Sequence, residues 1–378
     1  MTPLALWRRQ ILTLVSLEWK KTLLARRGLW VFALAFLPAL LIYLSALNLR
    51  NHRDELQRIL LNNPTAAATT ANIQIGMPFD RVSSILTGAN LNFTTITRAN
   101  RRTIIRYSDG VSSWDLIFVN GKLTDRTDRS LPALSDRIRQ FAAIFQYFFL
   151  RLAIFFGCVG IFINLFRGEM LDQSLHHYLL APVRRDVLLI GKYLSGLLST
   201  ILLFGSSTAL QFFFLLYAYP GPESASYMAT NGWSHFFNYL GVTALACVGY
   251  GSVFLASGIV LRNPLIPATI ILFWEASNWF LPELLKKFSI IYYLQALCPV
   301  VAPISPDVPD AFKMLVTAAA SIPTPLAILG ILIISTAVLA LAALSIRKLE
   351  ITYRSDRDYS HRRQSALLVP GGLSPPDV

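Results

Sequence analysis

Six long apolar stretches constrain this chain more than any other feature, because each has about the length that a helix needs to cross a lipid bilayer. The first reads GLWVFALAFLPALLIYLSAL and covers residues 28–47. The others cover about residues 141–166, 187–217, 236–261, 265–281 and 326–346. A helix rises about 1.5 Å per residue, so about 20 residues cross a hydrocarbon core of about 30 Å. The stretches predict a mainly α-helical polytopic membrane protein with six transmembrane helices, the last five lying within residues 141–354.

The charged residues support this class and indicate the partner. Only 15% of the 378 residues are charged and the formal net charge is +13, whereas soluble domains average about a quarter charged. Basic residues stand beside the first and last apolar stretches: Arg8, Arg9, Lys20, Lys21, Arg26, Arg27, Arg347 and Lys348. Such flanking clusters are typical of orientation signals and of attraction to anionic lipid. We therefore expect anionic lipid, and no nucleic acid, as a partner.

The distribution of basic residues also predicts the orientation. Six crossings place both termini on one side, together with the loop after the second stretch and the turn after the fourth. These segments carry arginine and lysine, and the positive-inside rule puts them in the cytoplasm. The insert after the first stretch is also rich in arginine, but long loops are exempt from this charge count. We expect a multi-pass protein of the bacterial inner (plasma) membrane with both termini cytoplasmic.

The two ends of the chain differ in character. Residues 1–27 place Leu4, Trp7, Ile11 and Leu14 at helical spacing among basic residues, which predicts an interfacial helix lying in the membrane surface. The alternative is that this segment is only the cytoplasmic start of the first span. Residues 355–378 are polar and end with proline and glycine, which predicts a disordered cytoplasmic tail.

A polar insert, residues 48–140, separates the first two spans and falls on the extracytoplasmic side. It contains IQIGMPFDRVSSIL, then NFTTITRA, RRTIIRYSDG and SSWDLIFVNGKLTDR, with turn signals at Asp109-Gly110 and Asn120-Gly121. We expect a small α+β unit with one short helix and an antiparallel meander of three strands. The pattern from IGMPFDRV to FVNGKL resembles the small lipoprotein domain of the outer-membrane barrel-assembly machinery.

A patterned, charged segment interrupts the apolar part between the second and third spans. It reads EMLDQSLHHYLLAPVRRDVLLIGK from Glu169 to Lys192. A helix over about 167–182 would align Leu171, Leu175 and Leu179 on one stripe, and Pro182 would end it. On the residues alone, this is either a surface anchor or a docking element. The residues that would form a docking surface are Arg167, Glu169, Asp172, Leu175, Leu179, Pro182, Arg184 and Arg185.

This segment, at this place in the topology, resembles the permease subunit of type-2 ABC exporters. The resemblance is carried by Glu169, Leu179, Pro182, Arg185, Gly191 and Lys192, in the pattern E…LL-x-P-x-x-R…G-K. It extends over the membrane chain from end to end, and a folded domain after the first span occurs in only some members. It implies a coupling helix that docks on a separate ATP-binding subunit, present in two copies, and a second permease protomer, identical or homologous. It also implies that Gly191 and Lys192 mark the return into the membrane.

Ionisable residues within the apolar stretches are further candidates. Glu275 lies in the fifth stretch near Asn278, and Arg151 lies in the second. A charge within a span is costly and is by default a functional candidate. Glu275 could line the transport pathway, or it could pair with a partner such as Arg151. After the fifth span, residues 285–298 are apolar but too short to cross, which predicts a re-entrant or surface helix.

No motif predicts chemistry on this chain itself. The Gly191-Lys192 pair is not a phosphate-binding loop, because Asp186 stands where a glycine is needed and Tyr193 follows the lysine. We expect no cofactor here, ATP and Mg²⁺ being bound by the partner, and no enzymatic activity. We expect a transmembrane exporter subunit that works as a dimer; the alternative is a membrane-anchored binding or scaffold protein whose extracytoplasmic unit does the work.

Overall fold

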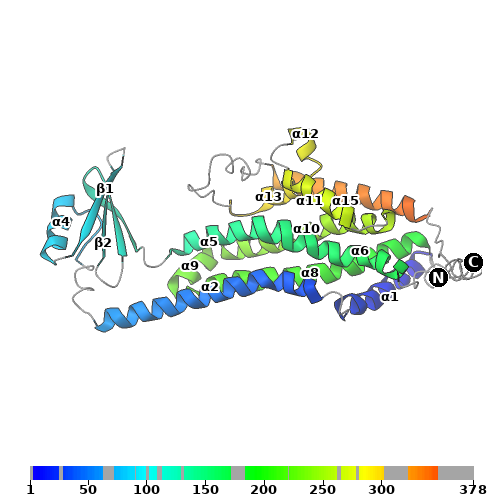
Figure 1. Ribbon diagram of the computed structural model, residues 1–378, viewed down its shortest axis with the longest axis horizontal. Helices are drawn as coiled ribbons and strands as arrows, with labels where there is room; N and C mark the ends of the chain where they lie inside the picture. The colour runs from blue at the N-terminus through cyan, green and yellow to red at the C-terminus, as the bar shows by residue number, and fades with distance from the viewer. Residues whose placement is uncertain are drawn as a thin grey trace, which may run out of the picture.

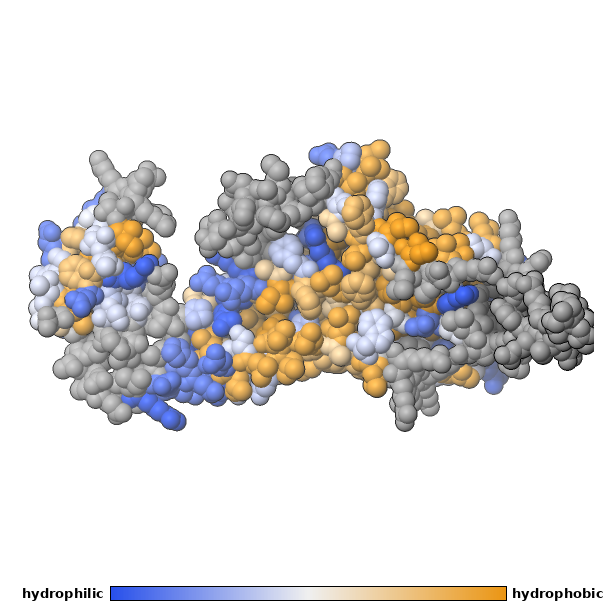
Figure 2. Space-filling model, viewed as in Figure 1, coloured by the Kyte–Doolittle hydropathy of each residue, from blue (hydrophilic) through white to orange (hydrophobic). Residues whose placement is uncertain are grey.

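The computed structural model shows a long helical bundle with a small sheet unit at one end and the N-terminal helix at the other (Figure 1). The structure describes residues 3–24, 29–62, 72–89, 91–98, 102–108, 113–128, 132–171, 184–219, 221–261, 265–277, 281–301 and 322–347. Apolar side chains cover much of the visible face of the bundle, and hydrophilic ones gather at the end nearest the sheet unit (Figure 2).

Five helical stretches in the described part of the chain are long and apolar enough to cross a membrane. They are α2 (Leu29–Asn62), the run α5 (Leu134–Ala143), η2 (Ile144–Ile154) and α6 (Phe155–Leu171), α8 (Arg185–Tyr217), the run α9 (Pro222–Tyr227), η3 (Met228–Gly232) and α10 (Trp233–Val260), and α15 (Thr324–Arg347). Leucines 40, 41 and 44 of α2 stay about half exposed on the bundle surface, as lipid-facing side chains do. The chain is therefore a mainly α-helical polytopic membrane protein.

The fifth expected span, residues 265–281, is shorter in the structure than the sequence predicts. The helix there, α11 (Leu265–Ala276), has 12 residues and is about 18 Å long, well short of a hydrocarbon core. After it come α12 (Glu283–Lys286) and α13 (Ile290–Leu297), which lies within the predicted helix 285–298. The carboxylate of Glu275 reaches the N-terminus of α13, so the chain folds back there rather than continuing straight.

The bundle core combines aromatic rings with close helix contacts. The ring centre of Tyr239 on α10 lies 5.1 Å from that of Phe141 and 4.7 Å from that of Phe145. The buried ring of Phe162 on α6 lies between Gly196 of α8 and Gly251 of α10, and a Cβ added at either glycine would approach it within 2.7 Å. The small residues of the fourth apolar stretch thus bring α10 against α6.

A four-stranded antiparallel sheet and one helix form a separate unit between α2 and α5. The elements are α4 (Phe79–Gly88), β1 (Phe93–Arg98), β2 (Arg102–Ser108), β3 (Ser113–Val119) and β4 (Lys122–Asp128), and the strand order is β1-β2-β3-β4. Val82 and Leu86 of α4 are fully buried against Ile105, Leu116 and Phe118 of the sheet. Apolar residues that alternate along the strands therefore supply a core distinct from that of the bundle.

Two connections of this sheet differ in how clearly the sequence signals them, and this explains why one strand was not predicted. Asn120 and Gly121 both have positive φ, 53° and 77°, so the tight turn between β3 and β4 is the one that an Asn-Gly pair favours. Three strands were expected and four are present. The connection between β1 and β2 is residues 99–101, Ala-Asn-Arg, which carries no glycine turn signal.

The packing of α10 predicts opposite outcomes for two glycine substitutions on that one helix. A Cβ at Gly258 would lie 3.0 Å from the carbonyl oxygen and 3.1 Å from the Cα of Ile163, whereas nothing lies within 4 Å of one at Gly241. We expect Gly258→Ala to destabilise the protein by about 1–3 kcal/mol, because backbone atoms of α6 must move. Gly241→Ala should be neutral or stabilising by up to about 1 kcal/mol. Thermal unfolding of both variants in detergent measures this, and equal stabilities would contradict the packing argument.

Candidate functional site

The segment predicted to be a coupling helix is described only at its two ends. α6 continues the second membrane stretch as far as Leu171, so Arg167, which is half-buried, and the backbone of Glu169 belong to that helix. Asp172, Leu175, Leu179 and Pro182 lie outside the described residues. The description resumes at Arg184, immediately before α8.

Four helices meet at the end of the bundle where residues 172–183 connect α6 to α8. Charged side chains from α1 (Pro3–Leu24), α8 and α15 contact one another there. We name as the loop-end cluster the residues Glu18, Arg184, Arg185, Asp186, Lys192 and Arg347. The contacts of these residues join the start of α8 to α1 and to α15.

The first tie joins α8 to the end of α15. The guanidinium of Arg347 donates to both carboxylate oxygens of Asp186, with Nε–Oδ1 at 3.0 Å and Nη2–Oδ2 at 2.9 Å. In return, Nη1 of Arg185 donates to the carbonyl oxygens of Ile346 at 3.1 Å and of Arg347 at 2.8 Å. These carbonyls belong to the last turn of α15, where helix carbonyls have no intrahelical donor. Arg185, predicted to face a docking partner, is thus placed on the C-terminus of α15.

The second tie joins α8 to α1. Gly191 packs against Leu14, whose Cβ would lie 3.1 Å from a Cβ added at the glycine. One residue on, Nζ of Lys192 lies 3.0 Å from Oε1 of Glu18, and the two side chains are only 0% and 2% exposed. The guanidinium carbon of Arg184 lies 4.9 Å from the ring centre of Trp7, also on α1. The N-terminal helix is therefore held along the first turns of α8 by a buried ion pair.

Glu18 is the residue that sequence reasoning missed at this site. On a helix lying in the membrane surface a carboxylate would face the headgroups, whereas the structure buries Glu18. A signal was present, because a lysine at the start of an apolar stretch needs an acidic partner, and Glu18 is the only acidic residue in positions 1–27.

Glu275 makes a helix cap at the other candidate position. Its Oε1 accepts the backbone N–H of Ile290 at 2.9 Å, and its Oε2 accepts the N–H of Ile291 and the hydroxyl of Ser289, each at 2.9 Å. The residue is 6% exposed. A carboxylate at a helix N-terminus satisfies orphan donors and opposes the positive end of the helix dipole. Glu275 therefore fixes α13 against α11.

The other two residues of that candidate site differ in outcome. Arg151 lies on η2 with its guanidinium carbon 5.7 Å from the ring centre of Tyr147. In the described part of the chain it forms no direct ion pair with Glu275, but its positive charge acts on the Glu275 carboxylate. Asn278 lies outside the described residues.

Comparison with known proteins adds no assignment. No protein-family model, curated protein or solved structure matches this chain. Among the residues that the structure describes, no group of three or more His, Cys, Asp and Glu could hold a metal ion. The function has to be argued from the geometry of the bundle.

The buried pair predicts strong coupling between Glu18 and Lys192. Lys192→Met leaves a buried carboxylate without its ammonium, which should cost about 3–5 kcal/mol, whereas the double variant Glu18→Leu/Lys192→Met should recover most of that loss. Arg184→Met, at an exposed position of the same cluster, should cost less than about 1 kcal/mol. Thermal unfolding in detergent of Lys192→Met, Glu18→Leu and the double variant gives the double-mutant cycle. Additive effects of the two single substitutions would refute the coupling.

The cap predicts that α13 loosens when the Glu275 carboxylate is removed. Glu275→Ala should raise the alkylation rate of Cys298, next to the end of α13, by about tenfold, because a lost cap costs about 1–2 kcal/mol. Cys158 and Cys247 are fully buried and should stay unreactive. Glu283→Ala, an exposed residue on α12, is the matched control. An unchanged Cys298 rate in Glu275→Ala would show that the carboxylate does not hold α13.

Proposed function

We propose that this chain is the transmembrane subunit of an ATP-driven exporter of the type-2 ABC class. Two such protomers, identical or homologous, would form the translocation pathway, and two separate ATP-binding subunits would drive it. The observation that carries the proposal is the loop-end cluster. It joins the return point of the 172–183 loop to α1 and α15 as well as to α8, through contacts at 2.8–3.1 Å.

These contacts would transmit a movement of the 172–183 loop to several helices at once. A short loop between two spans moves its own helices when it is pushed. Here a push on the loop also reaches α15 through Asp186 and Arg347, and α1 through Lys192 and Glu18, because these pairs are short and the second is buried. Coupling between distant sites travels through such contiguous contacts when the elements they join have two arrangements. Closure of the ATP-binding subunits would thus shift three helices together and change which side of the membrane the pathway faces.

The path of the chain supports six crossings, although α11 is short. α10 starts beside the end of α8, where the ring centres of Phe213 and Phe236 lie 5.4 Å apart, and it runs toward the loop end. α15 finishes at the loop end through Arg347, and its 24 residues span about 36 Å. These directions support a return of the chain across the bundle between Leu261 and Thr324, with α11 and α13 as the described parts of a broken passage. Broken helices within a membrane are tolerated where protein surrounds them.

The distribution of charges supports a cytoplasmic location for the loop end. Arg8, Arg9, Arg184, Arg185 and Arg347 belong to segments that meet there, as the positive-inside rule requires. The sheet unit lies at the opposite end of the bundle and would be extracytoplasmic (Figure 1). We propose the bacterial inner membrane as the location. The unit has its own core, so it could receive or release cargo without disturbing the bundle.

The test is copurification of the tagged full-length protein from native membranes. We expect an ATP-binding subunit to accompany the wild type. Leu175→Asp/Leu179→Asp should remove it and abolish ATP-dependent transport, because charges on the apolar stripe that the sequence predicts for residues 167–182 would prevent docking. Leu284→Asp, at a position 70% exposed on α12, is the control and should retain the partner. An ATP-binding subunit bound equally by all three proteins would refute docking through the loop.

A membrane-anchored binding protein is the second candidate, because the sheet unit is a folded body with a core separate from the bundle. It predicts that no ATP-binding subunit copurifies with the wild type. The same experiment therefore decides between the two functions.

A further inference from the structure

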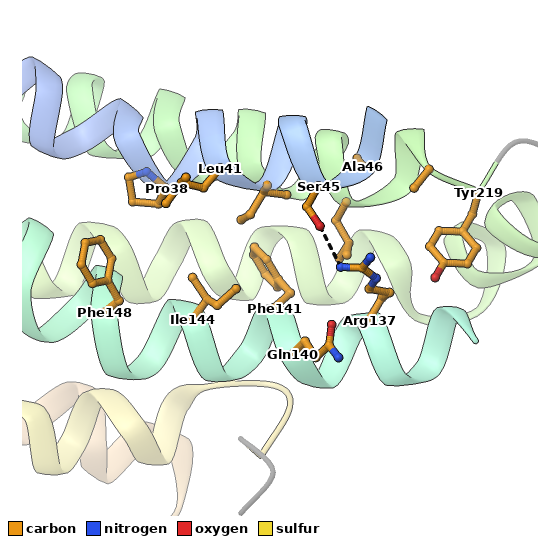
Figure 3. A pocket seen from close by; sticks show the side chains of 13 residues that line it. Pro38, Leu41, Ser45, Ala46, Arg137, Gln140, Phe141, Ile144, Phe148 and Tyr219 are labelled. Carbon is orange, nitrogen blue, oxygen red and sulfur yellow. Dashed lines mark hydrogen bonds between the residues drawn. The ribbon is translucent and has the colours of Figure 1, made fainter. Parts of the chain in front are cut away.

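A groove with an apolar wall and a basic end runs between α2, the α5–η2 run and α8 (Figure 3). Its volume is about 350 Å³, within the range of about 300–1,000 Å³ typical of small-molecule sites. Pro38, Leu41 and Ile42 of α2 face Phe141 and Ile144 of the neighbouring helix across it. Leu41 is 55% exposed, so the groove opens sideways from the bundle surface.

The polar groups of the groove lie together at its other end. The guanidinium of Arg137 donates from Nη1 to the hydroxyl of Ser45 at 3.0 Å, and Gln140 lies one turn further along α5 (Figure 3). The Nε–H of Arg137 is buried and has no hydrogen-bond partner in the described part of the chain. A buried donor without an acceptor is costly, so an acceptor supplied by a ligand would stabilise this arginine.

The polar end coincides with the place where α2 leaves the apolar region. Beyond Leu47 the helix reads NLRNHRDE, and Arg50 and Arg53 stack on Tyr217 and Tyr219 at 4.5 Å and 4.2 Å from the ring centres. Arginine and tyrosine together mark a membrane interface. Arg53 lies 4.0 Å from Glu223, which is well exposed. Among the described residues that line the groove itself Arg137 is the charged one, so the polar end of the groove carries a positive charge.

We propose that the groove binds a membrane phospholipid with an anionic headgroup. One acyl chain lies between Pro38 and Ile144, and the phosphate accepts hydrogen bonds from Arg137 at the interface. Pro38 and Ser45 are seven residues apart, so the apolar part extends about 10 Å into the membrane from the polar end. An acyl chain fits any apolar groove, and the phosphate of any phospholipid can accept from Arg137. Selection of anionic lipid comes from the whole headgroup, because a net negative headgroup is attracted to Arg137 whereas the ammonium of a zwitterionic one is repelled by it. This site lies at the end of the bundle away from the loop-end cluster, and it does not depend on the proposed export function.

The experiment measures lipid retained by the full-length protein in detergent. The protein is incubated with palmitoyl-oleoyl phosphatidylglycerol or with the phosphatidylcholine of the same acyl chains, and native mass spectrometry counts bound lipid. We expect preferential retention of phosphatidylglycerol by the wild type and about a tenfold loss of it in Arg137→Gln. Arg139→Gln makes the same change of charge two residues away, at a position 64% exposed and outside the groove, and should bind as the wild type does.

Two further variants keep the proposal testable if Arg137→Gln does not fold. Arg137→Lys retains the positive charge and should retain most of the phosphatidylglycerol. Ala46→Leu, at a buried position that lines the groove, should reduce retention of both lipids by filling the space for the acyl chain.

Three results would overturn the proposal. Equal retention of the two lipids by the wild type would show that the groove does not select an anionic headgroup. Equal retention of phosphatidylglycerol by Arg137→Gln and Arg139→Gln would place the contact elsewhere. A change in the proportion of dimer in Ala46→Leu, with bound lipid unchanged, would assign the groove to a second copy of this chain.

Discussion

The need to pair every charge that the bundle buries organises the rest of this structure. A helix surrounded by lipid or by other apolar helices has no water to solvate an ammonium or a carboxylate. Lys192 therefore meets Glu18 across α8 and α1, and Glu275 meets the free N–H groups at the start of α13. Arg185 meets the free carbonyls at the end of α15 in the same way. Each pairing decides where a helix must start, stop or lie against its neighbour.

These pairings also mark what could and could not be predicted from the sequence. The long apolar helices were predictable because runs of leucine, phenylalanine and alanine carry their own signal of length and hydrophobicity. The turn at Asn120-Gly121 was predictable because asparagine and glycine tolerate positive φ, which both residues adopt in the structure. The role of Glu275 was not, because two of its three donors are backbone N–H groups 15 and 16 residues away. The third is the hydroxyl of Ser289, and no sequence pattern links that serine to Glu275.

At the candidate docking segment, too, contacts between residues far apart in the sequence could not be predicted. Glu18 and Lys192 are 174 residues apart, and only the packing of α1 along α8 brings them together. Arg185 stands in a pattern that resembles a coupling motif, yet its guanidinium is engaged by the last turn of α15. A sequence pattern identifies the residue types at this end of the bundle, and tertiary contacts decide which of them face inward.

The contacts of Phe162 show that the geometry of the bundle depends on positions without a side chain. Its ring occupies the space that Gly196 and Gly251 leave empty on α8 and α10. Three helices thus share one point of contact where two of them present only backbone. A side chain at either glycine would push its helix away from the Phe162 ring. The spacing of α6, α8 and α10 therefore depends on the absence of side chains at positions 196 and 251.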